Sequence, residues 1–142
     1  MTSLEKSAEL LKRSAQLIDF RVLVVEDEPL EALDYCDRLS EAGAEVVGPY
    51  MSVTDALEAA LTEHLDVALL DYALADQNSQ ELQIALEARA IPFVVLTGYP
   101  RVLVRRTEQQ LVLSKPVSAD LLRMTVKAAA STTRQGQIIG NH

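Results

Sequence analysis

The sequence predicts an α/β protein built on a doubly wound, five-stranded parallel sheet with helices on both faces. Two observations predict this class. Five short apolar runs, rich in Val and Leu and without polar alternation, recur along the chain, as expected for strands buried on both faces of a parallel sheet. Segments of helical character separate these runs, and such strand–helix alternation is typical of doubly wound sheets.

The individual elements follow from local signals. Strands are expected at 21–25, 45–48, 67–70, 93–96 and 111–113, and helices at 30–42, 53–63, 79–90 and 119–130. Ser52 and Ser118 precede two of these helices and are good N-cap residues. Gly43 follows the first helix of this set as a C′ glycine. Between the fourth and fifth strands, the basic and β-branched stretch 102–108 indicates a short or irregular helix after Pro100.

Two segments lie outside the five strand–helix units. Residues 1–19 form an N-terminal extension that is helical over 3–18, where Leu4, Leu11 and Ile18 are spaced seven apart. We expect this helix to pack on the domain, and a homodimer seam remains the alternative, because two heptads are too few to define a coiled coil. The domain itself spans 20–131, and residues 132–142 are expected to form a flexible polar tail.

Composition excludes several classes of protein. The 142 residues are 49% apolar and 24% charged, which is the composition of one soluble globular domain. No signal peptide and no apolar run of about 20 residues is present, so a cytoplasmic protein without a membrane partner is expected. With 13 basic and 21 acidic residues the net charge is −8, which argues against binding to nucleic acid. The single cysteine, Cys36, is expected to be a buried and inert thiol.

Chemically active side chains follow the predicted strands. The carboxyl ends of parallel strands meet at one edge of a sheet, so the residues at these ends are expected to lie together. They are Glu26, Asp27 and Glu28 after the first strand, Asp71 after the third, Thr97 after the fourth and Lys115 after the fifth.

This set of side chains predicts a pocket for a phosphoryl group. Neighbouring carboxylates repel one another, and Mg²⁺ bound by Asp27 and Asp71 would remove that cost. Lys115 adds a fixed positive charge and Thr97 a hydrogen-bond donor. Phosphoryl transfer consists mainly of positioning and charge neutralisation, and an aspartate can be its nucleophile. Taken singly, each residue has an ordinary structural interpretation, such as an acidic helix start; their joint placement favours the pocket.

The motifs VLVVEDEP, VALLDYAL, VVLTGY and LSKP resemble, in order and spacing, the receiver domain of bacterial two-component response regulators over residues 20–131. The resemblance implies a flavodoxin-like or CheY-like fold with strand order 2-1-3-4-5. It implies that Asp71 accepts a phosphoryl group from a sensor histidine kinase, and that Thr97 and Lys115 bind this group. The implied Mg²⁺ ligands are Glu26, Asp27, Asp71 and the backbone carbonyl of Ala73.

Two positions depart from the usual receiver pattern. Receivers of this family commonly carry Phe or Tyr three residues before the lysine, where this chain has Val112, and a glycine that is common after the phospho-acceptor is absent. Both departures resemble a subclass with a Thr-Gly-Tyr signature that is often partnered with HWE-type histidine kinases. Tyr99 is then a candidate signalling residue, and an ordinary exposed loop tyrosine is the alternative.

Three functions remain open from the sequence. The leading one is a stand-alone, single-domain response regulator that signals by protein contact or phosphorelay to a downstream partner. It would catalyse only its own phosphorylation and dephosphorylation. The second is a receiver-like adaptor that binds partners independently of phosphate. The third, a phosphatase of the haloacid dehalogenase type, needs a second Asp where this chain has Ala73.

Overall fold

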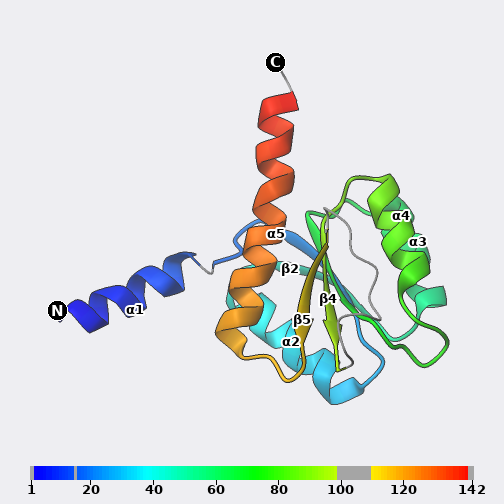
Figure 1. The fold of residues 1–142 in the computed structure, drawn as a ribbon, viewed down its shortest axis with the longest axis horizontal. Coiled ribbons are helices and arrows are strands. Elements are labelled where there is room, and N and C mark those ends of the chain that lie inside the picture. Colours follow the sequence, from blue (N-terminus) through cyan, green and yellow to red (C-terminus); the bar gives the residue numbers. More distant parts are fainter. Residues whose placement is uncertain (1, 15, 99–109, 141–142) are drawn as a thin grey trace.

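The computed structural model describes residues 2–14, 16–98 and 110–140 and forms a layered α/β domain (Figure 1). Its strands are β1 (Arg21–Val25), β2 (Glu45–Tyr50), β3 (Val67–Asp71), β4 (Phe93–Thr97) and β5 (Gln110–Ser114). Its helices are α1 (Ser3–Ser14), α2 (Pro29–Glu41), α3 (Val53–Thr62), α4 (Gln80–Ala88) and α5 (Ala119–Gly140). All five predicted strands are therefore present, each at or within two residues of its expected bounds.

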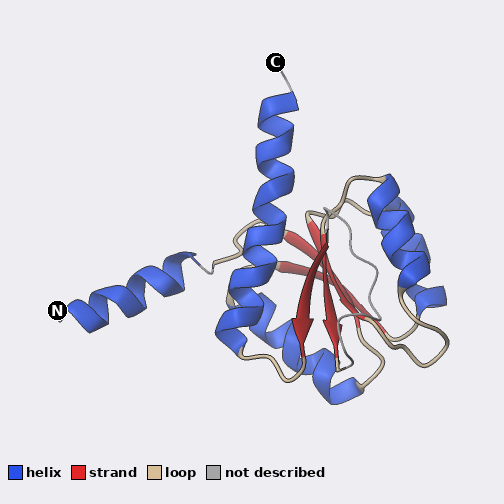
Figure 2. Cartoon of the chain, in the orientation of Figure 1, coloured by secondary structure: helices blue, strands red, loops and turns tan. Residues whose placement is uncertain are grey.

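The sheet is parallel throughout and has the order β2-β1-β3-β4-β5. This confirms the predicted fold class and strand order. Helices cover both faces, as Figure 2 shows: α2 and α5 lie on one side of the sheet, and α3 and α4 lie on the other. Each face has its own apolar core, because alternate side chains of a strand point to opposite faces. In β1, Leu23 and Val25 enter the core beneath α3 and α4, whereas Val22 and Val24 enter the core beneath α2 and α5.

Burial differs between the central and the edge strands. Every residue of β3 and β4 is buried, as are the last four residues of β1. The edge strands β2 and β5 are largely exposed or half-buried. The prediction of strands buried on both faces therefore applies to the centre of the sheet. It fails at the edges because an edge strand has a neighbour on one side only.

Capping residues mark where α2, α3 and α5 begin and where α2 ends. The Glu28 side chain accepts a hydrogen bond from the Glu31 backbone N–H at 2.8 Å, and Pro29 occupies the first turn of α2, as its fixed φ allows. Ser52 caps α3 through the N–H of Asp55 at 3.1 Å. Gly43 adopts a φ of +97° directly after α2, a conformation that favours glycine. Ser118 accepts from the Leu121 N–H at 3.1 Å at the start of α5, so the caps predicted at Ser52, Ser118 and Gly43 are confirmed.

The two terminal helices differ from expectation. Helix α1 ends at Ser14 because the chain turns so that Leu17 can enter the core, where its N–H bonds the Ala42 carbonyl at 2.7 Å. The expected packing of this helix on the domain is wrong for residues 2–10, which are all exposed, and α1 points away from the sheet (Figure 1). Helix α5 runs to Gly140, ten residues beyond its predicted end and through most of the segment assigned to a tail. This segment contains no proline, and extending an existing helix costs little.

The region after Gly98 bears on two further predictions. The helix expected at 102–108 and the signalling candidate Tyr99 lie outside the described residues. Within the part of the chain that the structure describes, no helix combines the length and apolar character needed to cross a bilayer.

Candidate functional site

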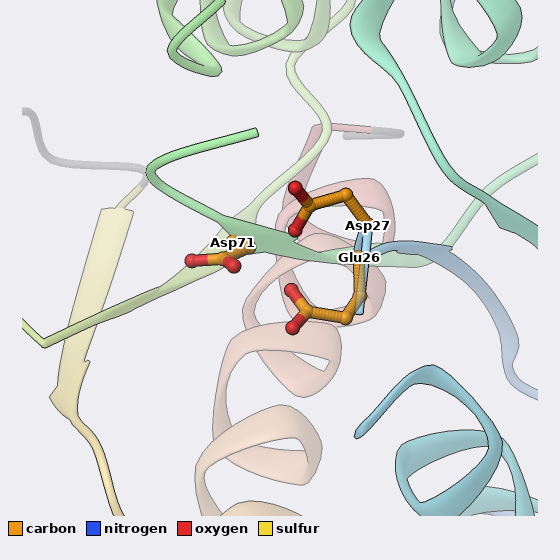
Figure 3. A group of neighbouring side chains, drawn as sticks. All are labelled: Glu26, Asp27 and Asp71. Atoms are coloured by element: carbon orange, nitrogen blue, oxygen red, sulfur yellow. The ribbon is translucent and has the colours of Figure 1, made fainter. Parts of the chain in front are cut away.

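Three carboxylates meet at the carboxyl edge of the sheet. One ligand atom from each of Glu26, Asp27 and Asp71 lies within 4.8 Å of the other two. Figure 3 shows the side chains of Glu26 and Asp27 turned toward the side on which Asp71 lies. Glu26 and Asp71 are buried and Asp27 is half-buried. The structure thus brings together three of the four acids expected at the strand ends, whereas the fourth, Glu28, caps the start of α2 instead.

Strand register explains why these acids meet. Val25 of β1 pairs with Leu70 of β3, so the residues that follow, Glu26 and Asp71, emerge next to each other. The N–H of Glu26 donates to the Tyr50 carbonyl at 2.9 Å, which fixes the backbone at the exit of β1. The two buried acids are therefore positioned by the centre of the sheet rather than by a mobile loop.

Lys115 follows β5, and its side chain reaches across the end of the sheet to the acids. Its backbone N–H donates to the Thr97 carbonyl at 2.9 Å, which places it directly beyond the end of β5. Its Nζ lies 3.1 Å from Asp71 Oδ2 and 3.4 Å from Glu26 Oε1. Thr97 itself is buried at the end of β4. The predicted lysine therefore contacts the predicted phospho-acceptor, and the predicted hydroxyl residue is its neighbour through the backbone.

A fourth acid, Glu31, belongs to this cluster and was not predicted from the sequence. It lies in the first turn of α2, and its Oε2 is 2.8 Å from Lys115 Nζ. Its position, five residues after Glu26 and at the start of the helix that leaves the acidic strand end, is a signal that could have identified it. The cluster therefore holds four carboxylates, three of which contact one ammonium group.

The charged groups in this cluster shift one another's pKa values. Burial raises the pKa of Glu26 well above its usual range, and the nearby carboxyl groups of Asp71 and Glu31 raise it further. The contact with Glu26, followed by that with Lys115, holds the pKa of Glu31 below its usual range. Burial would lower the pKa of Lys115, but its contacts with Glu31 and Asp71 outweigh burial and raise it. Lys115 is therefore a permanent cation at neutral pH.

The three carboxylates of Glu26, Asp27 and Asp71 are suited to binding a hard divalent cation. Glu26 is 1% exposed, and its Oε2 has no hydrogen-bond partner among the described residues. A buried carboxylate oxygen without a partner costs free energy, and a cation between Glu26, Asp27 and Asp71 would remove that cost. Oxygen ligands from carboxylates are the donors that Mg²⁺ prefers. These residues could hold a metal ion.

The loop after Asp71 is organised without the glycine common at that place. Ala73 forms an isolated antiparallel bridge with Asn78, and the Tyr72 N–H donates to the Leu96 carbonyl at 2.8 Å. Asp76 accepts hydrogen bonds from the N–H groups of Val53 and Thr54, at 3.2 and 3.3 Å. The first turn of α3 thus anchors this loop beside the acidic site.

Two further residues singled out in the sequence have ordinary surroundings. Val112 on β5 is half-buried and packs against the core beneath α3 and α4. Cys36 is half-buried against the opposite core, and burial raises the pKa of its thiol. An inert thiol is consistent with that shift, because the thiolate is the reactive form.

Comparison with solved structures identifies the class of this fold. The response regulator PhyR from Brucella abortus superposes with a TM-score of 0.82 and 26% identity, over 98% of this chain and 58% of that one. The receiver domain of Erythrobacter litoralis PhyR superposes with a TM-score of 0.69 and 28% identity, over 79% of this chain and 90% of that one. The chain therefore carries a response-regulator receiver domain of the CheY-like type.

Sequence comparison points to the same class. The transcriptional regulatory protein PdtaR of Mycobacterium tuberculosis is 31% identical over 120 residues, which are 81% of this chain and 58% of PdtaR. A response regulatory protein of Vibrio vulnificus is 31% identical over 109 residues, 74% of this chain and 45% of that protein. The chain thus spans about half the length of the curated relatives that it matches. No family model matches it. The receiver fold and a relative named as a response regulatory protein support a role in two-component signalling.

Proposed function

We propose that this chain is a phospho-receiver that accepts a phosphoryl group on Asp71 in a Mg²⁺-dependent reaction. One observation carries the proposal. The Nζ of Lys115 lies 3.1 Å from Asp71 Oδ2, and the same aspartate belongs to a group of three acids whose ligand atoms lie within 4.8 Å. An aspartate between a fixed cation and a metal-binding pair of acids is suited to phosphoryl transfer, which needs positioning and charge neutralisation.

The proposed step is an in-line displacement at phosphorus. A carboxylate oxygen of Asp71 forms a bond to phosphorus while the P–N bond to a histidine of the kinase breaks, and the electron pair stays on the histidine nitrogen. Lys115 offsets the negative charge on the transferred oxygens, and Thr97 supplies a hydroxyl group at the end of β4. Lys115 already contacts Asp71. Thr97 is linked to Lys115 by a backbone hydrogen bond.

The proposed metal ligands are the carboxylates of Glu26, Asp27 and Asp71 and the backbone carbonyl of Ala73. Mg²⁺ bound there would neutralise the acids and bind an oxygen of the incoming phosphoryl group. Of these ligands, Glu26 carries the unpartnered buried oxygen, so it has the most to gain from a cation.

The proposed partners are a sensor histidine kinase and a downstream protein or phosphotransfer partner in the cytoplasm. The resemblance to the Thr-Gly-Tyr subclass favours a kinase of the HWE type. Phosphotransfer profiling against the kinases of the same genome, with wild-type protein and Asp71→Asn, tests this proposal. We expect one kinase to label the wild type and none to label the variant. Labelling of both proteins alike would contradict the assignment of Asp71.

A phosphate-independent adaptor is the second candidate, and Val112 is the observation that favours it. Val112 stands where receivers commonly have an aromatic residue, and it packs against the core, so an aromatic side chain cannot report phosphorylation here. Partner capture distinguishes the two functions. A receiver should bind its downstream partner more tightly after treatment with acetyl phosphate and Mg²⁺, whereas an adaptor should bind it equally before and after.

A further inference from the structure

Glu31 makes the shortest of the three acidic contacts to Lys115. Its Oε2 lies 2.8 Å from the ammonium nitrogen, compared with 3.1 Å for Asp71 and 3.4 Å for Glu26. The three contacts come from three different elements, namely the start of α2 and the ends of β3 and β1. An ammonium group has three N–H donors, so these acids together can occupy every donor of Lys115.

This arrangement matters as soon as a phosphoryl group arrives. The Lys115 N–H that donates to Asp71 can donate to a phosphoryl oxygen instead, because the phosphoryl group becomes attached to Asp71. The Glu26 carboxylate can turn to a metal ion. Glu31 neither carries the phosphoryl group nor belongs to the three acids whose ligand atoms lie together, and it makes the shortest contact to Lys115. It therefore continues to hold the ammonium group and adds a negative charge next to the incoming anion.

We propose that Glu31 is a positioning residue that competes with the phosphoryl group for the ammonium of Lys115 and thereby slows phosphorylation by anionic donors. The proposal rests on the proposed function of Asp71. It predicts that removing the charge of Glu31 while keeping its shape frees Lys115 for the donor. The Glu31 side chain is 42% exposed, so the effect should be of the size of a partly exposed ion pair, about fivefold in rate.

The test compares Glu31→Gln with wild type, using small phosphoryl donors, saturating Mg²⁺ and intact mass measurement of Asp71 phosphorylation. With acetyl phosphate, a dianion at neutral pH, the P–O bond breaks and acetate leaves. With phosphoramidate, a monoanion, the P–N bond breaks and ammonia leaves. We expect Glu31→Gln to accelerate the reaction about fivefold with acetyl phosphate and by a smaller factor, about twofold, with phosphoramidate, because repulsion scales with donor charge.

Asp34→Asn is the matched control. Asp34 lies one turn further along α2, is half exposed and pairs with Arg38 at 2.8 Å, so the variant removes the same charge from the same helix without touching Lys115. Its rates should stay within about twofold of wild type. Glutamine is well suited to the third position of a helix, so Glu31→Gln should melt within a few degrees of wild type.

Several results would overturn the inference. One is that Glu31→Gln and wild type are phosphorylated at equal rates. Another is that Glu31→Gln is accelerated by the same factor with both phosphoryl donors. A third is that Asp34→Asn changes the rates as much as Glu31→Gln does. A Glu31→Gln protein that melts far below wild type would mean that Glu31 acts on stability rather than on Lys115. Failure of the proposed function is a separate outcome, because wild-type protein would then gain no phosphoryl group from either donor.

Discussion

Replacing Asp27 by Asn should stabilise the metal-free protein and remove most of its response to Mg²⁺. Asp27 places a ligand oxygen within 4.8 Å of those of Glu26 and Asp71, and no hydrogen bond or ion pair links its side chain to Lys115. Its charge therefore adds repulsion to the cluster without the compensation that Asp71 receives at 3.1 Å. The isosteric change to Asn removes this repulsion and leaves the shape of the site intact.

The magnitude follows from the distance. Two unit charges no more than 4.8 Å apart interact by at least roughly 3.5 kcal/mol at an effective dielectric constant of about 20. The raised pKa of Glu26 favours its neutral form, so Asp71 is the main source of repulsion, and Lys115 partly cancels it. Because Asp27 is also half exposed, we expect a gain of about 1 kcal/mol in the free energy of unfolding. For a chain of this size that raises the Tm by about 3–4 °C.

The assay is thermal unfolding of both proteins in EDTA and across a Mg²⁺ titration. The wild type should gain about 1.4 kcal/mol when Mg²⁺ reaches ten times its Kd, whereas Asp27→Asn should gain far less. Asp37→Asn, which removes an exposed charge elsewhere on α2, is the control and should change the Tm little in either condition. The reasoning is refuted if Asp27→Asn melts below wild type in EDTA, or if Mg²⁺ stabilises both proteins equally.

Four further predictions follow from the same structure. Since burial raises the pKa of Glu26 above its ordinary 4.5, the metal-free protein should lose stability as the pH rises above that value. Mg²⁺ binding, which needs the carboxylate, should release a proton at pH 7, seen by calorimetry in buffers of different ionisation enthalpy and absent in Glu26→Gln. Gly48→Ala should cost about 2 kcal/mol in urea unfolding, because Gly48 has a φ of +116° and a Cβ would lie 2.8 Å from the Val24 carbonyl oxygen. Gly98→Ala, with nothing within 4 Å, should change stability by less than about 0.5 kcal/mol; equal effects would contradict the strain argument. Cys36, whose pKa is raised by burial, should react with an aromatic disulfide reagent much more slowly in the native protein than in urea, and equal rates would exclude protection by the fold.

The fold could be predicted well because its signals are local and repeated. The central strands are nearly continuous apolar runs, and capping residues such as Ser52 and Gly43 mark the ends of helices. The errors fall where local pattern and tertiary context compete. Leu17 leaves the helical repeat of residues 3–18 because a place in the core outweighs one further helical turn. The polar composition after Ala130 does not stop α5, since polarity alone is no helix terminator.

The site could be predicted only in part, for a related reason. Residues at strand ends are brought together by topology, so Glu26, Asp71 and Lys115 follow from strand order alone. The contribution of Glu31 depends instead on the angle at which α2 leaves β1 and on the reach of the Lys115 side chain. The position of Glu31 in the sequence can mark it as a candidate, but neither the helix angle nor the reach of the lysine follows from that position. The same holds for Asp76, whose hydrogen bonds join its loop to the first turn of α3, a segment distant in sequence.

The central claim is that Asp71 accepts a phosphoryl group with the help of Mg²⁺, and intact mass measurement after incubation with acetyl phosphate tests it most directly. Wild-type protein with Mg²⁺ should gain the mass of one phosphoryl group, and peptide mapping should place it on Asp71. Wild type in EDTA and Asp71→Asn in Mg²⁺ should gain none. A wild-type protein that stays unmodified in Mg²⁺, or an Asp71→Asn variant modified to the same extent, would contradict the account.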